Sequence, residues 1–130
     1  MFSLGKKQSD RPPQTYDTPP GEIEKVVQIK LLCCMAGMSA VNIAGLSDEQ
    51  LKDEFNEQEC NRYEKLLLEA TNLARDITDV FCRGAALHLL IKPLMAAGDE
   101  IQAKKLFAVI EVEVIQDAVL ADFPRLGTNF

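Results

Sequence analysis

Sixteen consecutive residues of this chain, 31–46, carry no charged side chain. Such a stretch has to be covered, either by other parts of a protein or by lipid. It is shorter than the roughly 20 residues that a helix needs to cross a bilayer, and it contains Gly37, Ser39 and Asn42. The stretch therefore predicts a helix buried inside a helical bundle, and no membrane span.

Helical spacing begins upstream of the uncharged stretch. Charged residues Glu22, Glu24 and Lys25 lie on one side of the predicted helix, and the other side carries Ile23, Val26, Val27, Leu31 and Cys34. This pattern predicts a helix from Gly21 to Gly45. Residues 1–20 hold four of the six prolines and few apolar side chains. We therefore expect a disordered N-terminal tail of residues 1–20 and a single domain of residues 21–130.

Capping signals divide the rest of the chain into further helices. Ser47 begins a capping box, in which its hydroxyl and the side chain of Gln50 satisfy backbone donors. Asp79 is suited to an N-cap, and Gly98 to a left-handed C-terminal position. Between the capping box and Asp79, the apolar stripe shifts around the helix by about a third of a turn. This shift predicts a break near residues 56–58. The predicted helices beyond this break are 59–77, 80–97, 100–110 and 113–122.

Residues 110–114 are the one segment that alternates in the manner of a strand. A lone strand has no partner, and nothing else in the sequence offers a convincing second one. Gly84, in the middle of the apolar helix predicted for 80–97, indicates a close approach of another helix. We therefore predict an all-α domain, a bundle of five to six helices without a sheet.

The C-terminal half repeats with a period of 33 residues, which aligns Leu73 with Leu106, Ile77 with Ile110, Ala85 with Ala118, and Leu87 with Leu120. The segment 73–87, followed by the Ala-Ala-Gly-Asp sequence that ends at Asp99, resembles bacterial tetratricopeptide-type repeats over residues 62–123. Val112 departs from the pattern, because Asp79 stands in its place one repeat earlier. The resemblance implies a short α-solenoid as the alternative to a plain bundle, with a concave surface that binds a peptide or a partner helix.

Acidic side chains are concentrated in one stretch of the chain. The net charge is −6, and residues 47–64 hold seven carboxylates against Lys52 and Arg62, a local net charge of −5. This surplus argues against nucleic acid as a partner and favours another protein, one with a basic surface. Acidic runs on amphipathic helices are usually a solvated face, so that interpretation stays open beside a basic partner. The candidate partner-binding residues are Asp48, Glu49, Asp53, Glu54 and Glu57.

Sequence motifs for catalysis, cofactors or metals are not found. The seven glycines form no phosphate-binding pattern, and the four cysteines lack the C-x-x-C spacing of zinc and thiol-exchange sites. The single histidine, His88, lies six residues from Cys82, which points the two away from each other on a helix. We therefore expect no enzymatic activity, no cofactor and no metal. Without a signal peptide or paired cysteines, a cytoplasmic location is expected.

These observations favour a non-enzymatic protein–protein interaction module, adaptor or chaperone-like, that uses a helical groove and an acidic helix. Two alternatives stay open. In the first, the uncharged helix of residues 31–46 forms the seam of a self-assembling structural homodimer. In the second, Met35, Met38 and Met95 and a core without Trp favour a small carrier that holds an apolar ligand between helices.

Overall fold

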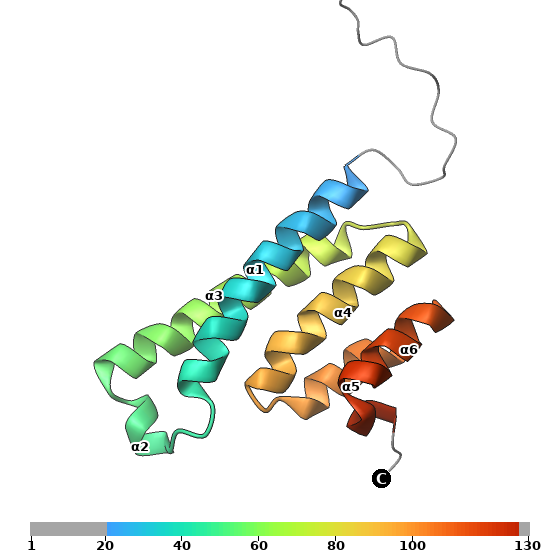
Figure 1. Cartoon of the computed structure of the whole chain (residues 1–130). Coiled ribbons are helices and arrows are strands. Elements are labelled where there is room, and N and C mark those ends of the chain that lie inside the picture. Colours follow the sequence, from blue (N-terminus) through green and yellow to red (C-terminus); the bar gives the residue numbers. More distant parts are fainter. Residues whose placement is uncertain (1–20, 128–130) are drawn as a thin grey trace, which may run out of the picture.

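The computed structural model describes residues 21–127. The predicted tail of residues 1–20 lies outside the described residues, as do residues 128–130. Within this range the chain forms six α-helices and no strand, which confirms the all-α prediction (Figure 1). The helices are α1 (Glu22–Ile43), α2 (Asp48–Leu51), α3 (Glu54–Arg75), α4 (Val80–Ala96), α5 (Glu100–Ala108) and α6 (Glu113–Asp122), followed by the short 3-10 helix η1 (Pro124–Gly127).

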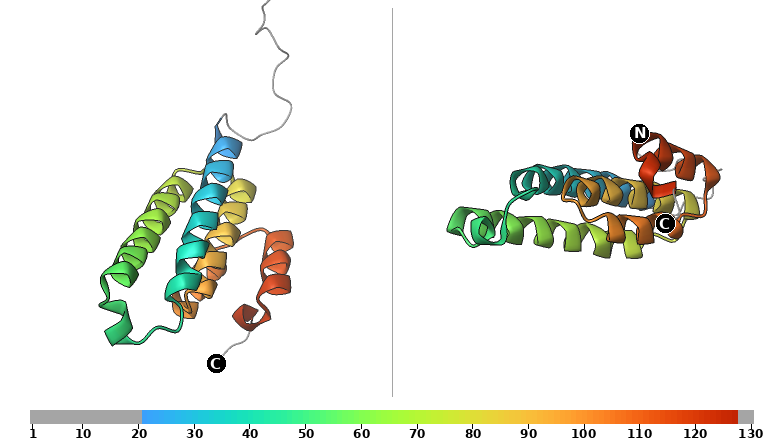
Figure 2. Two further views of the ribbon diagram at one scale, coloured as in Figure 1. Left: turned by 60° about the vertical axis from the view of Figure 1, so that its left-hand side comes forward. Right: turned by 90° about the horizontal axis from the view of Figure 1, so that it is seen from below.

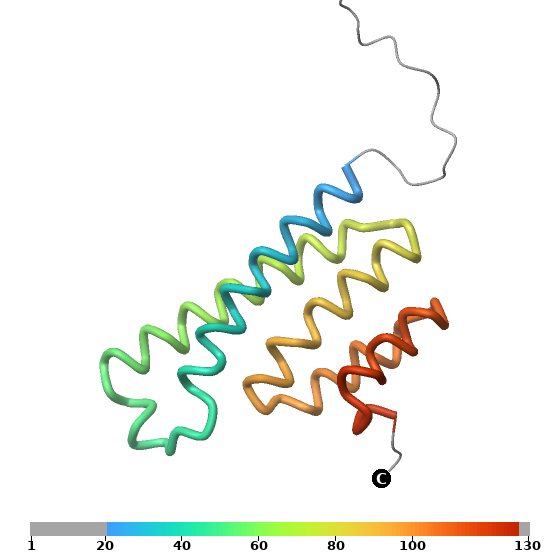
Figure 3. The backbone as a smooth tube through the Cα atoms, in the orientation of Figure 1, coloured from blue at the N-terminus to red at the C-terminus, as the bar shows by residue number. Residues whose placement is uncertain are grey.

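The long helices form two layers (Figure 2). Helices α1, α4 and α6 lie in one layer and run in the same direction, whereas α3 and α5 lie in the other layer and run in the opposite direction (Figure 3). Helix α1 packs along both α3 and α4. Helix α4 contacts α1, α3, α5 and α6, so it is the central helix that its apolar sequence predicts.

One apolar core joins the two layers and draws residues from every long helix. Its largest fully buried apolar side chains include Ile29 of α1, Leu90 and Ile91 of α4, and Val119 of α6. A second, smaller cluster lies between α1 and α3, where Ala36 and Ala40 pack against Tyr63. The small side chains of α1 allow this close packing of the two helices.

The predicted capping signals are present at the helix ends. The Ser47 hydroxyl accepts a hydrogen bond from the Gln50 backbone N–H at 3.2 Å, and the Ser47 N–H donates to the Gln50 side chain at 2.9 Å. Asp79 caps α4 by accepting from the Cys82 N–H at 2.9 Å. Gly98 has a φ of +83°, the left-handed conformation that a side chain disfavours. The predicted boundaries at these three places are confirmed.

The break predicted near residues 56–58 was wrong by a few residues, because α3 already begins at Glu54. Phe55 is one of the apolar residues before the predicted break, but its side chain is exposed, so its position around the helix says nothing about the core. The alternating segment of residues 110–112 is an extended connection, not a strand. Nε2 of Gln116 donates a hydrogen bond to the Ile110 carbonyl of this connection at 2.7 Å. Helix α6 begins at Glu113 as predicted.

Helices α4 and α6 approach each other closely at Gly84. A Cβ atom on Gly84 would lie 2.9 Å from Cδ1 of Ile115, which confirms the predicted close approach. Buried positions also recur along the chain at an offset of 33 residues. The pairs in which both residues are buried include Ala70 and Ala103, Ile77 and Ile110, Cys82 and Ile115, Ala86 and Val119, and Pro93 and Leu126.

The prediction that the uncharged helix is buried inside the bundle was wrong for one of its two faces. Leu31 and Met38 are 61% and 64% exposed, whereas Glu22, predicted on the polar side, is only 3% exposed. The reason is that α1 lies at the edge of its layer and contacts neighbours only through the side that carries Ile29 and Ala36. Helical spacing identified the helix but assigned the wrong face to the core.

Candidate functional site

The five predicted partner-binding carboxylates lie together at one end of the molecule, on α2 and the start of α3 (Figure 1). Their side chains are all exposed: Asp48, Glu49, Asp53, Glu54 and Glu57. Within residues 21–127 none of them takes part in an ion pair. We call this set the acidic end. Its carboxylates are accessible to a partner.

These carboxylates also have a role within the chain. Asp48 and Glu49 lie in the first turn of α2, and Glu54 and Glu57 lie in the first turn of α3. A helix N-terminus carries partial positive charge, so each carboxylate there stabilises its helix by about 0.3–1 kcal/mol. The clustering of acidic residues is therefore explained by two helix starts close together in the sequence.

A second exposed region lies on α1, on the side opposite its buried residues. At 100° per residue the centres of the exposed and buried sets lie about 180° apart around the helix. Helix α1 is thus apolar on two opposite faces, and only one of them is covered by described residues. The exposed face, here called the α1 stripe, consists of Ile23, Val27, Leu31, Met35, Met38 and Val41, with side chains between 36% and 68% exposed.

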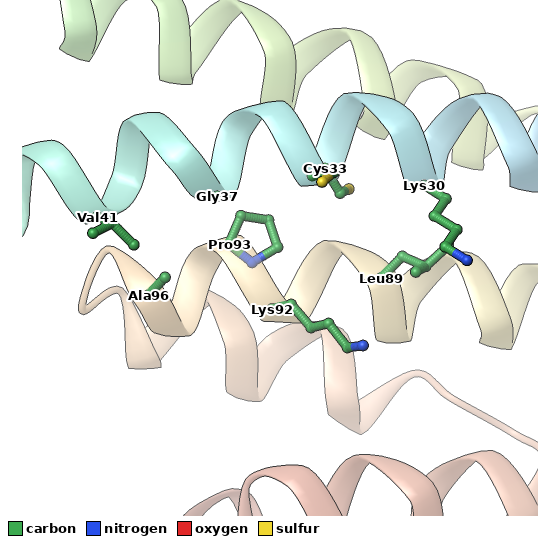
Figure 4. A pocket seen from close by; sticks show the side chains of 9 residues that line it. Lys30, Cys33, Gly37, Val41, Leu89, Lys92, Pro93 and Ala96 are labelled. Atoms are coloured by element: carbon green, nitrogen blue, oxygen red, sulfur yellow. The ribbon is translucent and has the colours of Figure 1, made fainter.

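A groove separates α1 from α4 beside the α1 stripe, with a volume of about 400 Å³ (Figure 4). A Cβ atom on Gly37 would meet no atom within 4 Å, so this glycine leaves the groove open. Lys30 and Lys92 are the charged lining residues, and neither forms an ion pair within residues 21–127. The groove is lined by Lys30, Cys33, Cys34, Gly37, Val41, Leu89, Lys92, Pro93 and Ala96.

A smaller hollow of about 320 Å³ lies on another side of α4, against α3 and α5. Arg83 at its rim pairs with Glu111, with 3.3 Å between Nη2 and Oε2. Its apolar lining residues include Leu87, Leu90 and Leu106. This hollow has no row of exposed apolar side chains beside it comparable to the α1 stripe, so it is the weaker candidate for a binding site.

Glu22 fixes how α1 is placed on the rest of the molecule. Its Oε1 accepts hydrogen bonds from the backbone N–H groups of Thr78 at 2.8 Å and Asp79 at 2.9 Å. The bond from Asp79 is the main cause of a lowered pKa of the Glu22 carboxyl, with further help from Thr78 and from Lys25. This buried carboxylate ties the start of α1 to the turn between α3 and α4, so it is structural.

Three of the groups that could support catalysis, Cys33, Cys82 and Tyr63, are buried, and His88 has a partner. Burial raises the pKa of the Cys33 thiol to about 12 and also raises that of Cys82, so both thiols stay protonated at neutral pH. Burial is the main cause that raises the pKa of Tyr63 to about 12. His88 joins α4 to α6 through a distance of 2.9 Å between its Nε2 and Oδ2 of Asp122. Within residues 21–127, no three His, Cys, Asp or Glu side chains come together as a metal site would require.

Helix α1 has the length and hydropathy of a helix that could cross a membrane, with 22 residues and a mean hydropathy of 1.6. Its length is about 33 Å at 1.5 Å per residue, which matches a hydrocarbon core of about 30 Å. The stretch of 16 uncharged residues therefore understated the apolar length. The expectation of no membrane span now rests on the packing of α1 against α3 and α4 and on buried Glu22, and it stays a prediction.

An outward apolar face on α1 was predicted only in the homodimer alternative, whereas the preferred interpretation buried the helix in the bundle. A signal for it exists in the sequence, because Val27, Leu31, Cys34, Met38 and Val41 are separated by steps of 4, 3, 4 and 3 residues. Such alternation is typical of the seam between two packed helices. Buried positions on α1 follow a different set of residues, so the helix carries two patterns at once.

The chain matches no protein-family model, no curated protein and no solved structure. Function therefore has to be inferred from the α1 stripe, the groove and the acidic end themselves.

Proposed function

We propose that this protein is a non-enzymatic interaction module, an adaptor or chaperone-like protein, that holds a helical segment of another protein on the face formed by α1 and α4. The observation that carries the proposal is the α1 stripe, a row of large apolar side chains exposed beside an open groove. Single exposed apolar residues are ordinary on protein surfaces. A contiguous row of them next to a groove is typical of an interaction site.

A helix is the occupant that suits the dimensions of this face. The α1 stripe extends from Ile23 to Val41, about 27 Å along the helix at 1.5 Å per residue, which is longer than most small ligands. Amphipathic helices bind in apolar grooves through anchors at every third or fourth position. The expected partner therefore contributes a helix of about five turns with one apolar face.

Charges around the face favour a partner of defined polarity. Lys30 and Lys92 line the groove, so they suit a carboxylate on the bound helix. Val41 lies at the opposite end of the groove from Lys30 (Figure 4), and there α1 leads into the acidic end. A bound helix with acidic residues near the lysines and basic residues beyond Val41 meets complementary charge at both places, which fixes its direction.

The arrangement of the helices supports a solenoid-like binding surface. Buried residues recur at an offset of 33 residues through α3, α4, α5 and α6, as expected for a repeated helix pair. In this proposal the layer of α1, α4 and α6 (Figure 2) provides the peptide-binding side that the resemblance to tetratricopeptide-type repeats implies. In this proposal α1 provides the extra cover that so short an array of repeats needs.

The test is affinity capture with the full chain from an extract of its own cells at low salt. Gly37→Leu adds a large side chain at a residue that lines the groove and where a Cβ meets no atom within 4 Å, so we expect it to abolish capture of a protein that the wild type retains. Neutralising the acidic end with Asn and Gln should weaken capture at low salt only. Leu68→Glu, at an exposed residue of α3, is the control and should change nothing. Retention of no protein, or of the same protein by every variant, contradicts the proposal.

A second candidate function is favoured by the groove alone. Its volume of about 400 Å³ lies in the usual range for small-molecule sites, roughly 300–1,000 Å³. Apolar walls with Lys30 and Lys92 suit an amphiphile with an apolar tail and a carboxylate. Native mass spectrometry of the purified chain distinguishes this carrier from a protein-binding module: a bound small molecule that Gly37→Leu displaces supports it, and a bare chain speaks against it.

A further inference from the structure

We infer that the α1 stripe is the seam of a homodimer, in which the α1 helices of two copies pack antiparallel about a twofold axis near Cys34. The inference rests on the proposed function only in that both use this face; here a second copy of this chain, not another protein, occupies it. The residues that form the seam are Val27, Leu31, Met38 and Val41 of the α1 stripe, together with the exposed Cys34 beside them.

The spacing of the seam residues points to a helix as their partner. Steps of 4, 3, 4 and 3 residues correspond to the seven-residue repeat of helices that pack side chains into holes on a facing helix. The positions that would face solvent in such a pair are instead buried in the monomer, among them Ile29, Leu32 and Ala36. The seam residues and the buried residues of α1 are therefore two separate sets on opposite faces of the helix.

The area that a stable dimer needs determines how far the interface extends. Specific interfaces bury about 800 Å² and about 20–30 residues on each partner, whereas the α1 stripe has six residues. The interface must then include the groove and the outward side of α4, where Phe81 is 55% exposed and Leu89 is half-buried. The α1 stripe and the groove lie side by side on one face. A twofold axis therefore places the α1 stripe of each copy over the groove of the other.

The acidic end decides the orientation of the two helices. In a parallel pair the two acidic ends would lie next to each other, each in a stretch of local net charge −5, and would repel. An antiparallel pair puts them at opposite ends of the assembly. A twofold axis through the middle of the seam then brings Val27 of each copy opposite Val41 of the other, and the two Cys34 residues close to the axis.

Sedimentation equilibrium of the full chain at about 5–200 µM measures the association directly. We expect a species of twice the chain mass of 14.4 kDa. Met38→Glu should weaken association at least about tenfold, because it buries an unpaired charge. Leu68→Glu makes the same change at an equally exposed site on α3 and should not alter association. A monomer over the whole range, or equal weakening by both variants, overturns the inference.

Disulfide cross-linking tests the position of the axis. Cys34 is the exposed thiol, Cys60 is half-buried, and Cys33 and Cys82 are buried. Diamide takes up two electrons and two protons as two thiols join, so mild oxidation should give a covalent dimer of the wild type and of Cys60→Ser. Cys34→Ser should give none, and Met38→Glu far less than the wild type. A dimer that forms without cross-linking through Cys34 overturns the proposed seam.

The two experiments separate the dimer from the proposed function. A chain that sediments as a monomer, yet captures a protein that Gly37→Leu releases, retains the function and refutes the dimer. A chain that dimerises through Cys34 while its capture of protein is unaffected by Gly37→Leu retains the dimer and refutes partner binding in the groove.

Discussion

The α1 stripe and the acidic end are both exposed, but the chain itself explains only one of them. Carboxylates in water are well solvated, and those at the starts of α2 and α3 stabilise their helices. Removing apolar surface from water is favourable by about 25 cal/mol for each Å². No part of residues 21–127 covers the α1 stripe, so this free energy is not gained within the chain. An exposed apolar row therefore indicates a partner more strongly than a cluster of like charges does.

The largest effect is expected from a pair of variants that compares the two faces of α1. Ile29 is fully buried in the core and Leu31 is exposed in the stripe. Ile29→Ala should lower the free energy of unfolding by about 3 kcal/mol, the usual loss for a buried residue of this size. Leu31→Ala in the dilute chain should change it by no more than about 0.5 kcal/mol. Urea unfolding followed by circular dichroism measures both.

Protein concentration provides the control for this pair. If the stripe binds a second copy, the wild type gains apparent stability as its concentration rises, and Leu31→Ala loses that gain. Ile29→Ala should be destabilised equally at every concentration. Similar losses for the two variants in dilute solution would show that the stripe belongs to the core of the folded chain.

The attachment of α1 depends on pH through Glu22. A carboxyl whose pKa is lowered by folding stabilises the folded state above its unfolded pKa of about 4.3, and this stabilisation disappears as the pH falls through the lowered, folded value. The Glu22 pKa is lowered by bonds from Asp79 and Thr78. Glu22→Gln should therefore be less stable than the wild type at neutral pH, and the two should approach each other near pH 3.

Urea unfolding at both pH values checks the Glu22 prediction. Glu24→Gln, at an exposed residue of the same helix, is the matched control and should follow the wild type at each pH. A difference between Glu22→Gln and the wild type that stays constant with pH would mean that the charge of Glu22 does not hold α1 in place.

Local signals made much of the fold predictable, whereas the placement of α1 was not. Caps such as Ser47 and Asp79 act within three residues along the chain, so sequence alone reveals them. The contacts of Glu22 reach residues 56 and 57 positions away, and no periodicity encodes such a contact. A helix with apolar residues on two faces can use either, so the stripe became visible only when the neighbours of α1 were known.

A smaller effect of opposite sign is expected at Gly37, which borders the groove beside the stripe. A helix-interior glycine is about 1 kcal/mol less favourable than alanine, and a Cβ here meets no atom within 4 Å. Gly37→Ala should therefore raise the free energy of unfolding by up to about 1 kcal/mol. Gly84→Ala is the contrasting variant: its Cβ would meet Cδ1 of Ile115 at 2.9 Å, so that side chain must shift, and the variant should gain less stability than Gly37→Ala or lose some. Loss of stability by Gly37→Ala would indicate that other atoms already occupy the groove at this residue.

The smallest effect is expected when all five carboxylates of the acidic end become amides. Each carboxylate at a helix start stabilises by about 0.3–1 kcal/mol at low salt, but five like charges in one region also repel one another. The two contributions oppose each other, so the net change in the free energy of unfolding should stay within about 1 kcal/mol. Roughly 1 M salt should reduce it further, because screening acts within about 3 Å there. A loss of several kcal/mol that survives high salt would make the acidic end a structural element. Of the two exposed regions, only the α1 stripe would then have no role within the folded chain.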